Sequence, residues 1–371
     1  MFLAVPHIFA LFRGRPGRPA KPRAGMRRGA LALLAAAAAS ATGLAAASSL
    51  TVLMGDDIPA SSEFVQQLRA DQEPGSRFDL VRLPAGGAAP SSEPQLAPDA
   101  GTDPDRAANA GVRTRGLRAA PADAPLTMAV GPAAARAAVE RPGQEPLVLA
   151  MLSRLDYETL KAASPAALRR SDRRVGVLLR DPAMTDQLAL MSAVLPQKHR
   201  VGVVATPESE PLVRELQRAA QVANPAWDVR IEYAPDARSL AAALRIVVPQ
   251  SDALMVLPDL IGDNQAATLS VLRAGAGAGL PVFGASEGLV RSGGLAAAVS
   301  TPSQLAQQAR LLGQKVAGAS VGAGAGGSSN NVPLVEAATP ATVRVNATVA
   351  RGLGLRLPEE RELADRLAPP R

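Results

Sequence analysis

Short apolar runs that end in a polar loop and lead into a helix are the feature that most limits how this 371-residue chain can fold. The pattern is clearest where the apolar run Ala253 to Leu257 is followed by Pro-Asp and then by a segment of helical periodicity. Roughly ten such alternations succeed one another from Leu50 onward. Continuous apolar runs are typical of parallel strands that are buried on both faces. The pattern therefore predicts an α/β protein built on parallel sheets.

Interruptions near Asp172 and Ser300 predict two smaller sheets in place of one wide sheet. Right-handed crossovers place helices on both faces of such sheets. Ligands bind at the carboxyl ends of parallel strands, so the polar loops at these ends are expected to surround one cleft. This arrangement favours a binding protein over a catalyst.

Residues 1–47 are expected to be a leader that directs export, with Met26 as the start of translation. Two arginines after Met26 precede a run rich in Ala and Leu, and Ala45–Ala47 fits a signal-peptidase site. The alternative is that this run is retained as a membrane anchor. The chain contains no cysteine, so neither a lipid anchor nor a disulfide is expected. We expect a protein that is free in the periplasm after signal-peptide cleavage.

The net charge of +7 arises in the leader. Residues 1–47 contain seven of the 40 Lys and Arg residues and none of the 33 Asp and Glu residues. The rest of the chain is therefore balanced in charge. A phosphate-backbone partner would need a clustered basic surface, so no nucleic-acid partner is expected.

Residue types that support catalysis are scarce. The two histidines are His7, which lies in the leader, and His199, which precedes a strand and so lies at the end opposite the expected cleft. Asp56 and Asp57 form the only adjacent acidic pair at a strand end, which is weak evidence for a metal site. The glycine run Gly275–Gly279 closes a helix, whereas a dinucleotide fingerprint opens one. We expect no enzyme activity, no metal and no cofactor.

Polar side chains at the carboxyl ends of strands are the candidate ligand contacts. Asp259 is favoured because it follows Val256-Leu257-Pro258 directly, so its carboxylate should project into the cleft and accept hydrogen bonds from a ligand amine or hydroxyl. Ser286 is either a ligand contact or the N-cap of a helix over 287–291. The expected contacts are Asp259, Ser286, Ser209, Asp56, Asp57 and Glu208.

Two segments are expected to be flexible inserts, because they are rich in Ala, Gly, Pro and Ser and show no periodicity. They are residues 84–118 and 317–331.

Four stretches resemble a known family in their order along the chain. They are VLMGDDIPASSEFVQQLRA, DQLALMSAVLPQKHRVGVV, LPDLIGDNQAATLSVLRAGAGAGLPVFGASEGLVRSGGLAAAVSTPSQLAQQARLL and VRVNATVARGLGLRLP. They look like the ABC transporter substrate-binding proteins of the group that includes tryptophan and tyrosine uptake binding proteins. The resemblance implies a periplasmic-binding-protein type I fold, in which two α/β lobes close on a ligand by hinge motion. Lobe 1 would comprise 48–178 plus 300–318, and lobe 2 would comprise 179–299 plus 340–358.

The function implied by the resemblance is that of a monomeric periplasmic solute-binding component of an ABC importer. Its partners would be a small solute, such as an amino acid, and an ABC permease in the inner membrane. Aromatic residues are scarce, and an aromatic ligand is usually sandwiched by rings, so a small polar or carboxylate ligand is equally compatible. The alternatives are a periplasmic sensor or accessory protein without a transport role, and a cleft that has lost ligand binding.

Overall fold

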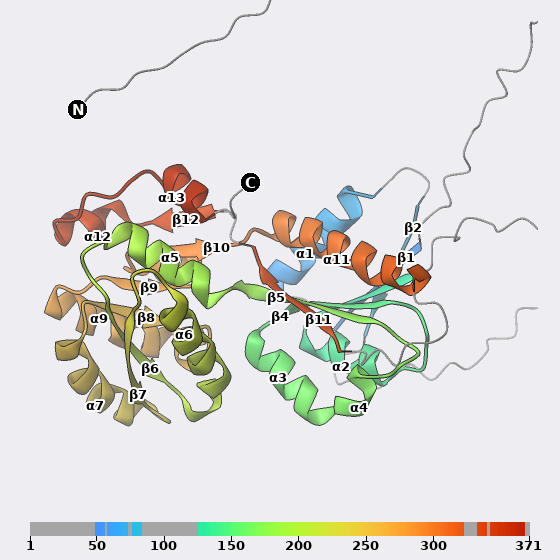
Figure 1. The fold of residues 1–371 in the computed structure, drawn as a ribbon, viewed down its shortest axis with the longest axis horizontal. Coiled ribbons are helices and arrows are strands. Elements are labelled where there is room, and N and C mark those ends of the chain that lie inside the picture. Colours follow the sequence, from blue (N-terminus) through green and yellow to red (C-terminus); the bar gives the residue numbers. More distant parts are fainter. Residues whose placement is uncertain are drawn as a thin grey trace, which may run out of the picture. The chain divides into compact units, whose positions relative to one another are not determined.

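The structure, a computed structural model, forms two six-stranded sheets (Figure 1). The residues it describes are 49–55, 58–72, 76–83, 125–322, 332–339 and 342–367. The expected leader and the expected insert over 84–118 lie outside these residues. None of the helices in these ranges is both long enough and apolar enough to cross a membrane.

The first sheet has the strand order β11-β5-β4-β3-β1-β2, and every pairing in it is parallel. Every residue of β4 is buried, as its apolar sequence LVLAML predicts. We call this sheet and the helices packed on it lobe 1. The strands are β1 (Ser49–Met54), β2 (Arg77–Arg82), β3 (Leu126–Val130), β4 (Leu147–Leu152), β5 (Val175–Pro182) and β11 (Leu334–Ala338).

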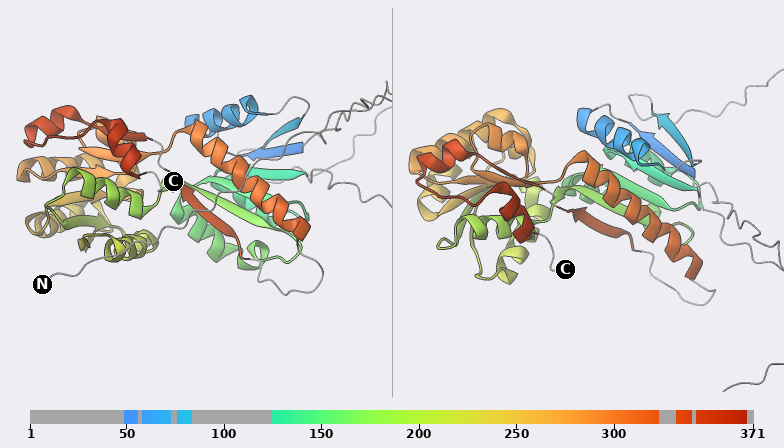
Figure 2. Two further views of the ribbon diagram at one scale, coloured as in Figure 1. Left: turned by 45° about the horizontal axis from the view of Figure 1, so that its top comes forward. Right: turned by 90° about the horizontal axis from the view of Figure 1, so that it is seen from above.

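Helices cover both faces of the lobe 1 sheet, because alternate strand residues point to opposite sides. On one face, α1 (Pro59–Ala70) and α11 (Pro302–Gly322) pack against residues of β1, β3 and β4 (Figure 2). The other face is covered by α2 (Pro132–Glu140), α3 (Arg154–Ala163) and α4 (Pro165–Leu168). Each face therefore has its own apolar core.

The second sheet has the order β12-β10-β9-β8-β6-β7 and is parallel except for β12, which pairs antiparallel with β10. We call this sheet and its helices lobe 2. Its strands are β6 (Arg200–Ala205), β7 (Asp228–Tyr233), β8 (Ala253–Val256), β9 (Val282–Gly284), β10 (Ala296–Val299) and β12 (Thr342–Val345). The prediction of an α/β protein with two mainly parallel sheets is confirmed.

Two apolar cores hold the helices of lobe 2 on its sheet. One core contains residues of α5 (Met184–Val194), α6 (Glu210–Val222), α12 (Ala347–Gly352) and α13 (Glu360–Leu367). The other contains residues of α7 (Ala237–Val247), α8 (Leu260–Asp263), α9 (Gln265–Ala278) and α10 (Glu287–Arg291).

Two short 3-10 turns and a glycine mark helix ends in lobe 2. The turn η2 (Pro207–Ser209) precedes α6, and the turn η3 (Val248–Gln250) follows α7. Gly279 ends α9 in the left-handed conformation, with φ of 67°, which glycine adopts without steric cost.

The chain passes between the sheets three times: from β5 to α5, from β10 to α11 and from β11 to β12. Strand β11 was not expected from the sequence, and it forms an edge of the lobe 1 sheet beside β5. Helix α11 continues to Gly322, so the segment expected to be an insert from residue 317 begins inside this helix. A single residue, Ala183, separates β5 from α5.

Gly176 in β5 lets α11 lie close to the lobe 1 sheet. A Cβ atom at this position would lie 2.8 Å from Val316 Cγ2 and 3.0 Å from Leu312 Cγ. We expect Gly176→Ala to lower the free energy of unfolding by about 1–3 kcal/mol through overpacking, measured by urea titration. Gly277→Ala is the control, because no atom lies within 4 Å of its added Cβ in the exposed part of α9. That variant should gain about 0.5–1 kcal/mol, and equal effects of the two substitutions would contradict the packing argument.

Candidate functional site

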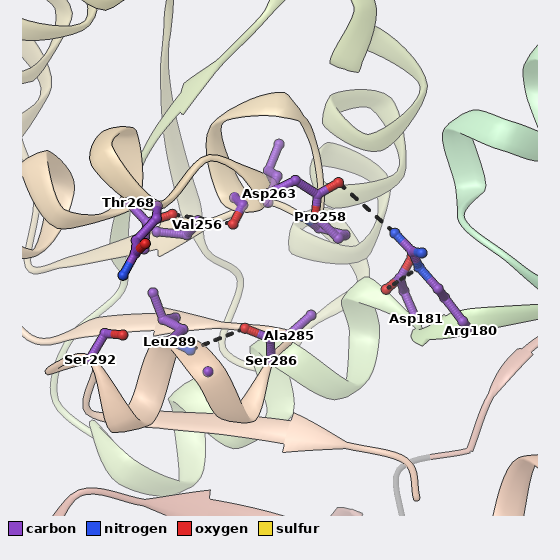
Figure 3. A pocket seen from close by; sticks show the side chains of 14 residues that line it. Arg180, Asp181, Val256, Pro258, Asp263, Thr268, Ala285, Ser286, Leu289 and Ser292 are labelled. Carbon is purple, nitrogen blue, oxygen red and sulfur yellow. Dashed lines mark hydrogen bonds and ion pairs between the residues drawn. The ribbon is translucent and has the colours of Figure 1, made fainter. Parts of the chain in front are cut away.

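A cavity of about 450 Å³ lies at the ends of β5, β8 and β9. Its walls come from the loop after β8 with α8, from the loop after β9 with α10, and from the last residues of β5 (Figure 3). The carboxyl ends of these parallel strands therefore meet there, as the sequence predicts. The polar side chains that line it belong to Arg180, Asp181, Asp263, Gln265, Thr268, Ser286 and Ser292.

Asp181 lines the cavity and has a buried carboxylate oxygen that the described residues do not satisfy. Its side chain is 16 % exposed, and its Oδ1 atom lies 3.8 Å from Arg180 Nε. Its Oδ2 atom is buried and has no hydrogen-bond partner within the described part of the chain. An unmade hydrogen bond on a buried oxygen costs about 1–3 kcal/mol, and more when the group is charged. The site therefore holds an acceptor that a ligand donor can satisfy.

Burial raises the pKa of Asp181 to about 6. The neighbouring guanidinium of Arg180 lowers this pKa, whereas the charges of Asp263, Asp156 and Glu215 raise it further. These three acids come from α8, α3 and α6, so both lobes contribute to the negative potential at this carboxylate. A cation placed beside Asp181 would be stabilised by the same potential.

Arg180 is held loosely at the mouth of this site. Its Nη2 atom lies 4.0 Å from Asp263 Oδ2, and the two side chains are 37 % and 65 % exposed. Such exposed pairs contribute about 0–1 kcal/mol. The guanidinium is therefore free to turn toward an anionic group of a ligand at little cost.

The structure contradicts the interpretation of Asp259 as a side chain that projects into the cleft. The residue is 1 % exposed, and its Oδ1 atom accepts hydrogen bonds from the backbone nitrogens of Ile261 at 2.9 Å and Gly262 at 3.1 Å. Its Oδ2 atom accepts a hydrogen bond from the Ser209 hydroxyl, which also lies 2.9 Å from Thr206 Oγ1. Asp259 is the N-cap of α8, and this local bonding competes with projection into solvent.

The remaining expected contacts fall into three groups. Ser286 lines the cavity, and its hydroxyl accepts a hydrogen bond from Leu289 N at 3.2 Å (Figure 3), so the N-cap role is confirmed and a ligand contact stays a prediction. Ser209 is fully buried with Asp259, and Glu208 is exposed in η2 and is not part of the cavity wall. Asp56 and Asp57 lie outside the described residues.

Sequence reasoning missed Asp181 as a site residue. The apolar run RVGVLL ends at Leu179, whereas β5 continues through Asp181 to Pro182. An Arg-Asp pair directly after a buried apolar run was the available signal, because polar side chains at the carboxyl end of a parallel strand lie where ligands bind.

Trp227 and His199 belong to a separate part of lobe 2. The two rings are in edge contact with centroids 5.9 Å apart, and Trp227 Nε1 donates a hydrogen bond to Ser192 Oγ at 2.9 Å. Trp227 is buried in the core beside α5 and α6, and neither residue lines the cavity. None of the described residues that line the cavity is aromatic, so the cavity offers no ring on which a ligand could stack.

Asp259→Ala should lower the free energy of unfolding by about 2–4 kcal/mol, because it removes a helix cap and leaves buried hydroxyls without their acceptor. Asp263→Ala in the same short helix is the control, since its side chain is 65 % exposed, and it should change stability by less than about 0.5 kcal/mol. Urea titrations of both variants provide the measurement. An Asp259→Ala protein as stable as its parent would restore the interpretation of Asp259 as a ligand contact.

Asp181 should make the stability of the ligand-free protein depend on pH. Its folded pKa of about 6 is above the value of 3.8 for a free side chain, so the folded state holds the proton to higher pH. The contribution of Asp181 to stability should therefore be greatest at and below about pH 4, fall by about 2–3 kcal/mol as the pH rises through about 6, and then level off. Asp181→Asn should remove this fall, whereas Glu208→Gln should retain it. Parallel pH profiles of the parent and Asp181→Asn would contradict the assignment.

Comparison with known proteins shows the family and the fold of this chain. The family model of the ABC transporter substrate binding proteins matches residues 128–364. No curated protein matches the chain. A ligand-free, open structure of a substrate-binding protein with adhesive properties from Clostridium difficile has 15% identity and a TM-score of 0.53, and the match covers 84% of this chain and 96% of that one. This likeness shows the two-lobed periplasmic-binding-protein type I fold.

Two further solved structures are similar over most of their length. A conserved domain protein from Vibrio cholerae has 19% identity and a TM-score of 0.48, covering 86% of this chain and 98% of that chain. An ABC domain in complex with L-Trp from Streptococcus pneumonia has 15% identity and a TM-score of 0.46, covering 84% of this chain and 96% of that chain. Because the family model spans well over half of the sequence, this chain belongs to the ABC transporter substrate-binding protein family, whose members bind small solutes.

Proposed function

We propose that this protein is the periplasmic solute-binding component of an ABC importer and that its solute carries a cationic amino group. It would act as a monomer, deliver the solute to a permease in the inner membrane, and perform no catalysis. The observation that carries the proposal is the buried carboxylate of Asp181 in the wall of a cavity where three strand ends meet. Family membership supports the solute-binding role.

The chemistry of Asp181 favours an ammonium group over an uncharged hydroxyl. Its Oδ2 atom lacks a donor, and acids from both lobes add negative potential at this position. A charge-assisted hydrogen bond from an ammonium to this oxygen is roughly twice as strong as a neutral one. The cavity of about 450 Å³ is in the range of small-molecule sites.

The far end of such a solute would face groups that suit a carboxylate or hydroxyl. Arg180 is loosely paired, and the hydroxyls of Ser286 and Ser292 lie in the same wall. An amino acid offers both kinds of group, which agrees with the ligand class implied by the sequence. Arg180 would then bind the carboxylate in a fork geometry.

Hinge closure would complete the site. The walls described above come from lobe 2 and, in lobe 1, from the end of β5 alone. We expect other residues of lobe 1 to cover the solute when the lobes close. The connection from β5 to α5 is one residue long and that from β10 to α11 is two residues long. Short connections at the ends of elements absorb the backbone rotation of a hinge.

The test is a thermal-shift screen of the chain from Ser49 onward against amino acids, polyamines, carboxylates, nucleosides and sugars, followed by calorimetry. A ligand at a hundred times its Kd stabilises the folded state by about 2.7 kcal/mol. We expect an amine-bearing solute to bind, and its affinity to fall about tenfold for each pH unit below 6, where Asp181 must lose a proton first.

Asp181→Asn should abolish this binding, and Glu208→Gln, which changes an exposed acid outside the cavity, should leave it unchanged. Tight binding of a neutral solute that survives Asp181→Asn would retain the solute-binding role and overturn the amine assignment. The absence of any ligand across the screen, with a cooperative melt, would instead favour a sensor or a cleft that has lost binding.

A further inference from the structure

A second feature of lobe 2 is a groove along the outer side of α7 and α9, which lie side by side on the same face of the sheet (Figure 1). It consists of two hollows, of about 540 Å³ and about 340 Å³, that share Leu240 and Ser270. The hollows are therefore adjacent, and we call them together the α7–α9 groove. It begins at η3 and ends at Leu260 in α8.

The floor of this groove is apolar and partly open to solvent. It is formed by Leu240, Leu244, Val248 and Ala274 together with the exposed Ala241. At the far end, Leu260 is 63 % exposed. An apolar groove between two helices is the kind of surface into which an amphipathic helix can dock.

The rim is positively charged at the η3 end. Arg245 and Arg273 line this half of the groove, and no acidic residue lines it. Within the described part of the chain, neither arginine forms an ion pair with a carboxylate, and Arg245 Nε donates to the Ala241 carbonyl at 3.2 Å. The acid at the other end, Asp236, already accepts hydrogen bonds from two backbone nitrogens as the cap of α7. Its charge is therefore engaged locally.

We propose that the α7–α9 groove binds an amphipathic helix of a partner protein, with the carboxylates of that helix placed over Arg245 and Arg273. Helix α7 has 11 residues, or about 16 Å of length, which matches three turns of a partner helix at 5.4 Å each. Apolar side chains at every third or fourth position would fill the groove, as in other helix-in-groove complexes. The surface lies outside the solute cavity and does not depend on the proposed solute.

The probe is a fluorescent peptide of about 14 residues with leucines at helical spacing and three glutamates near one end. The control peptide has lysines in place of the glutamates. Fluorescence anisotropy with the protein should show about tenfold tighter binding of the acidic peptide at low salt, and this preference should shrink as salt screens the two rim pairs. Arg245→Gln with Arg273→Gln should remove the preference and retain the binding common to both peptides.

Ala241→Glu and Ala242→Glu form a matched pair on α7. Both alanines are exposed, but only Ala241 lines the groove. Ala241→Glu should weaken binding of the acidic peptide at least about tenfold by placing a charge in the apolar floor, and Ala242→Glu should change it less than about twofold. Thermal melts should be alike for the two variants.

Four results with the peptides and vesicles would overturn the proposal. They are no binding of the acidic peptide, equal affinity for both peptides in the parent, equal effects of the two alanine substitutions, and binding of anionic phospholipid vesicles in place of the peptide. A dimer in sedimentation equilibrium that Ala241→Glu dissociates would also overturn it, because a second copy of the chain would then occupy the groove.

Discussion

Parallel strands all end at one edge of their sheet, and the site is a consequence of that constraint. In lobe 2 the loops after β8 and β9 leave the sheet at the same edge, and β5 of lobe 1 ends in the wall of the same cavity. Both faces of a parallel sheet are covered by helices. The strand ends are therefore the place where polar groups can gather. The cavity is therefore built on the ends of rigid strands, and its side chains are held by the sheets.

Two aspartates at strand ends show how the same residue type serves opposite purposes. Asp259 after β8 and Asp181 at the end of β5 are both largely buried. Asp259 has three donors to its carboxylate and stabilises the start of α8, whereas Asp181 Oδ2 has none in the described part of the chain. A buried charge without donors opposes folding, and a carboxylate whose pKa is shifted in this way is a candidate for a functional role. The carboxylate of Asp259 is therefore satisfied within the protein, whereas Asp181 keeps the acceptor that we propose a solute satisfies.

The fold was predictable to a large extent, because buried parallel strands such as β4 and β8 leave apolar runs that sequence reasoning detects. Strand β11 escaped detection because LVEAA at a sheet edge is only partly buried and follows a stretch of low complexity. The position of the cavity at the strand ends was also predictable. The roles of individual side chains were not predictable. Asp259 accepts hydrogen bonds from backbone nitrogens of the helix that it begins, and the lack of a donor to Asp181 Oδ2 among the described residues depends on residues far apart in the chain.

The most direct test of this account is an NMR titration of the side-chain carboxylates of the ligand-free protein, with Asp181 assigned by comparison with Asp181→Asn. The account predicts that Asp181 titrates with a pKa of about 6 because it is buried beside other acids. It also predicts that this pKa falls when a cationic solute binds. A pKa at or below the ordinary value of about 3.9 would show that the carboxylate is already solvated or paired, and would contradict its role as the group that awaits the solute.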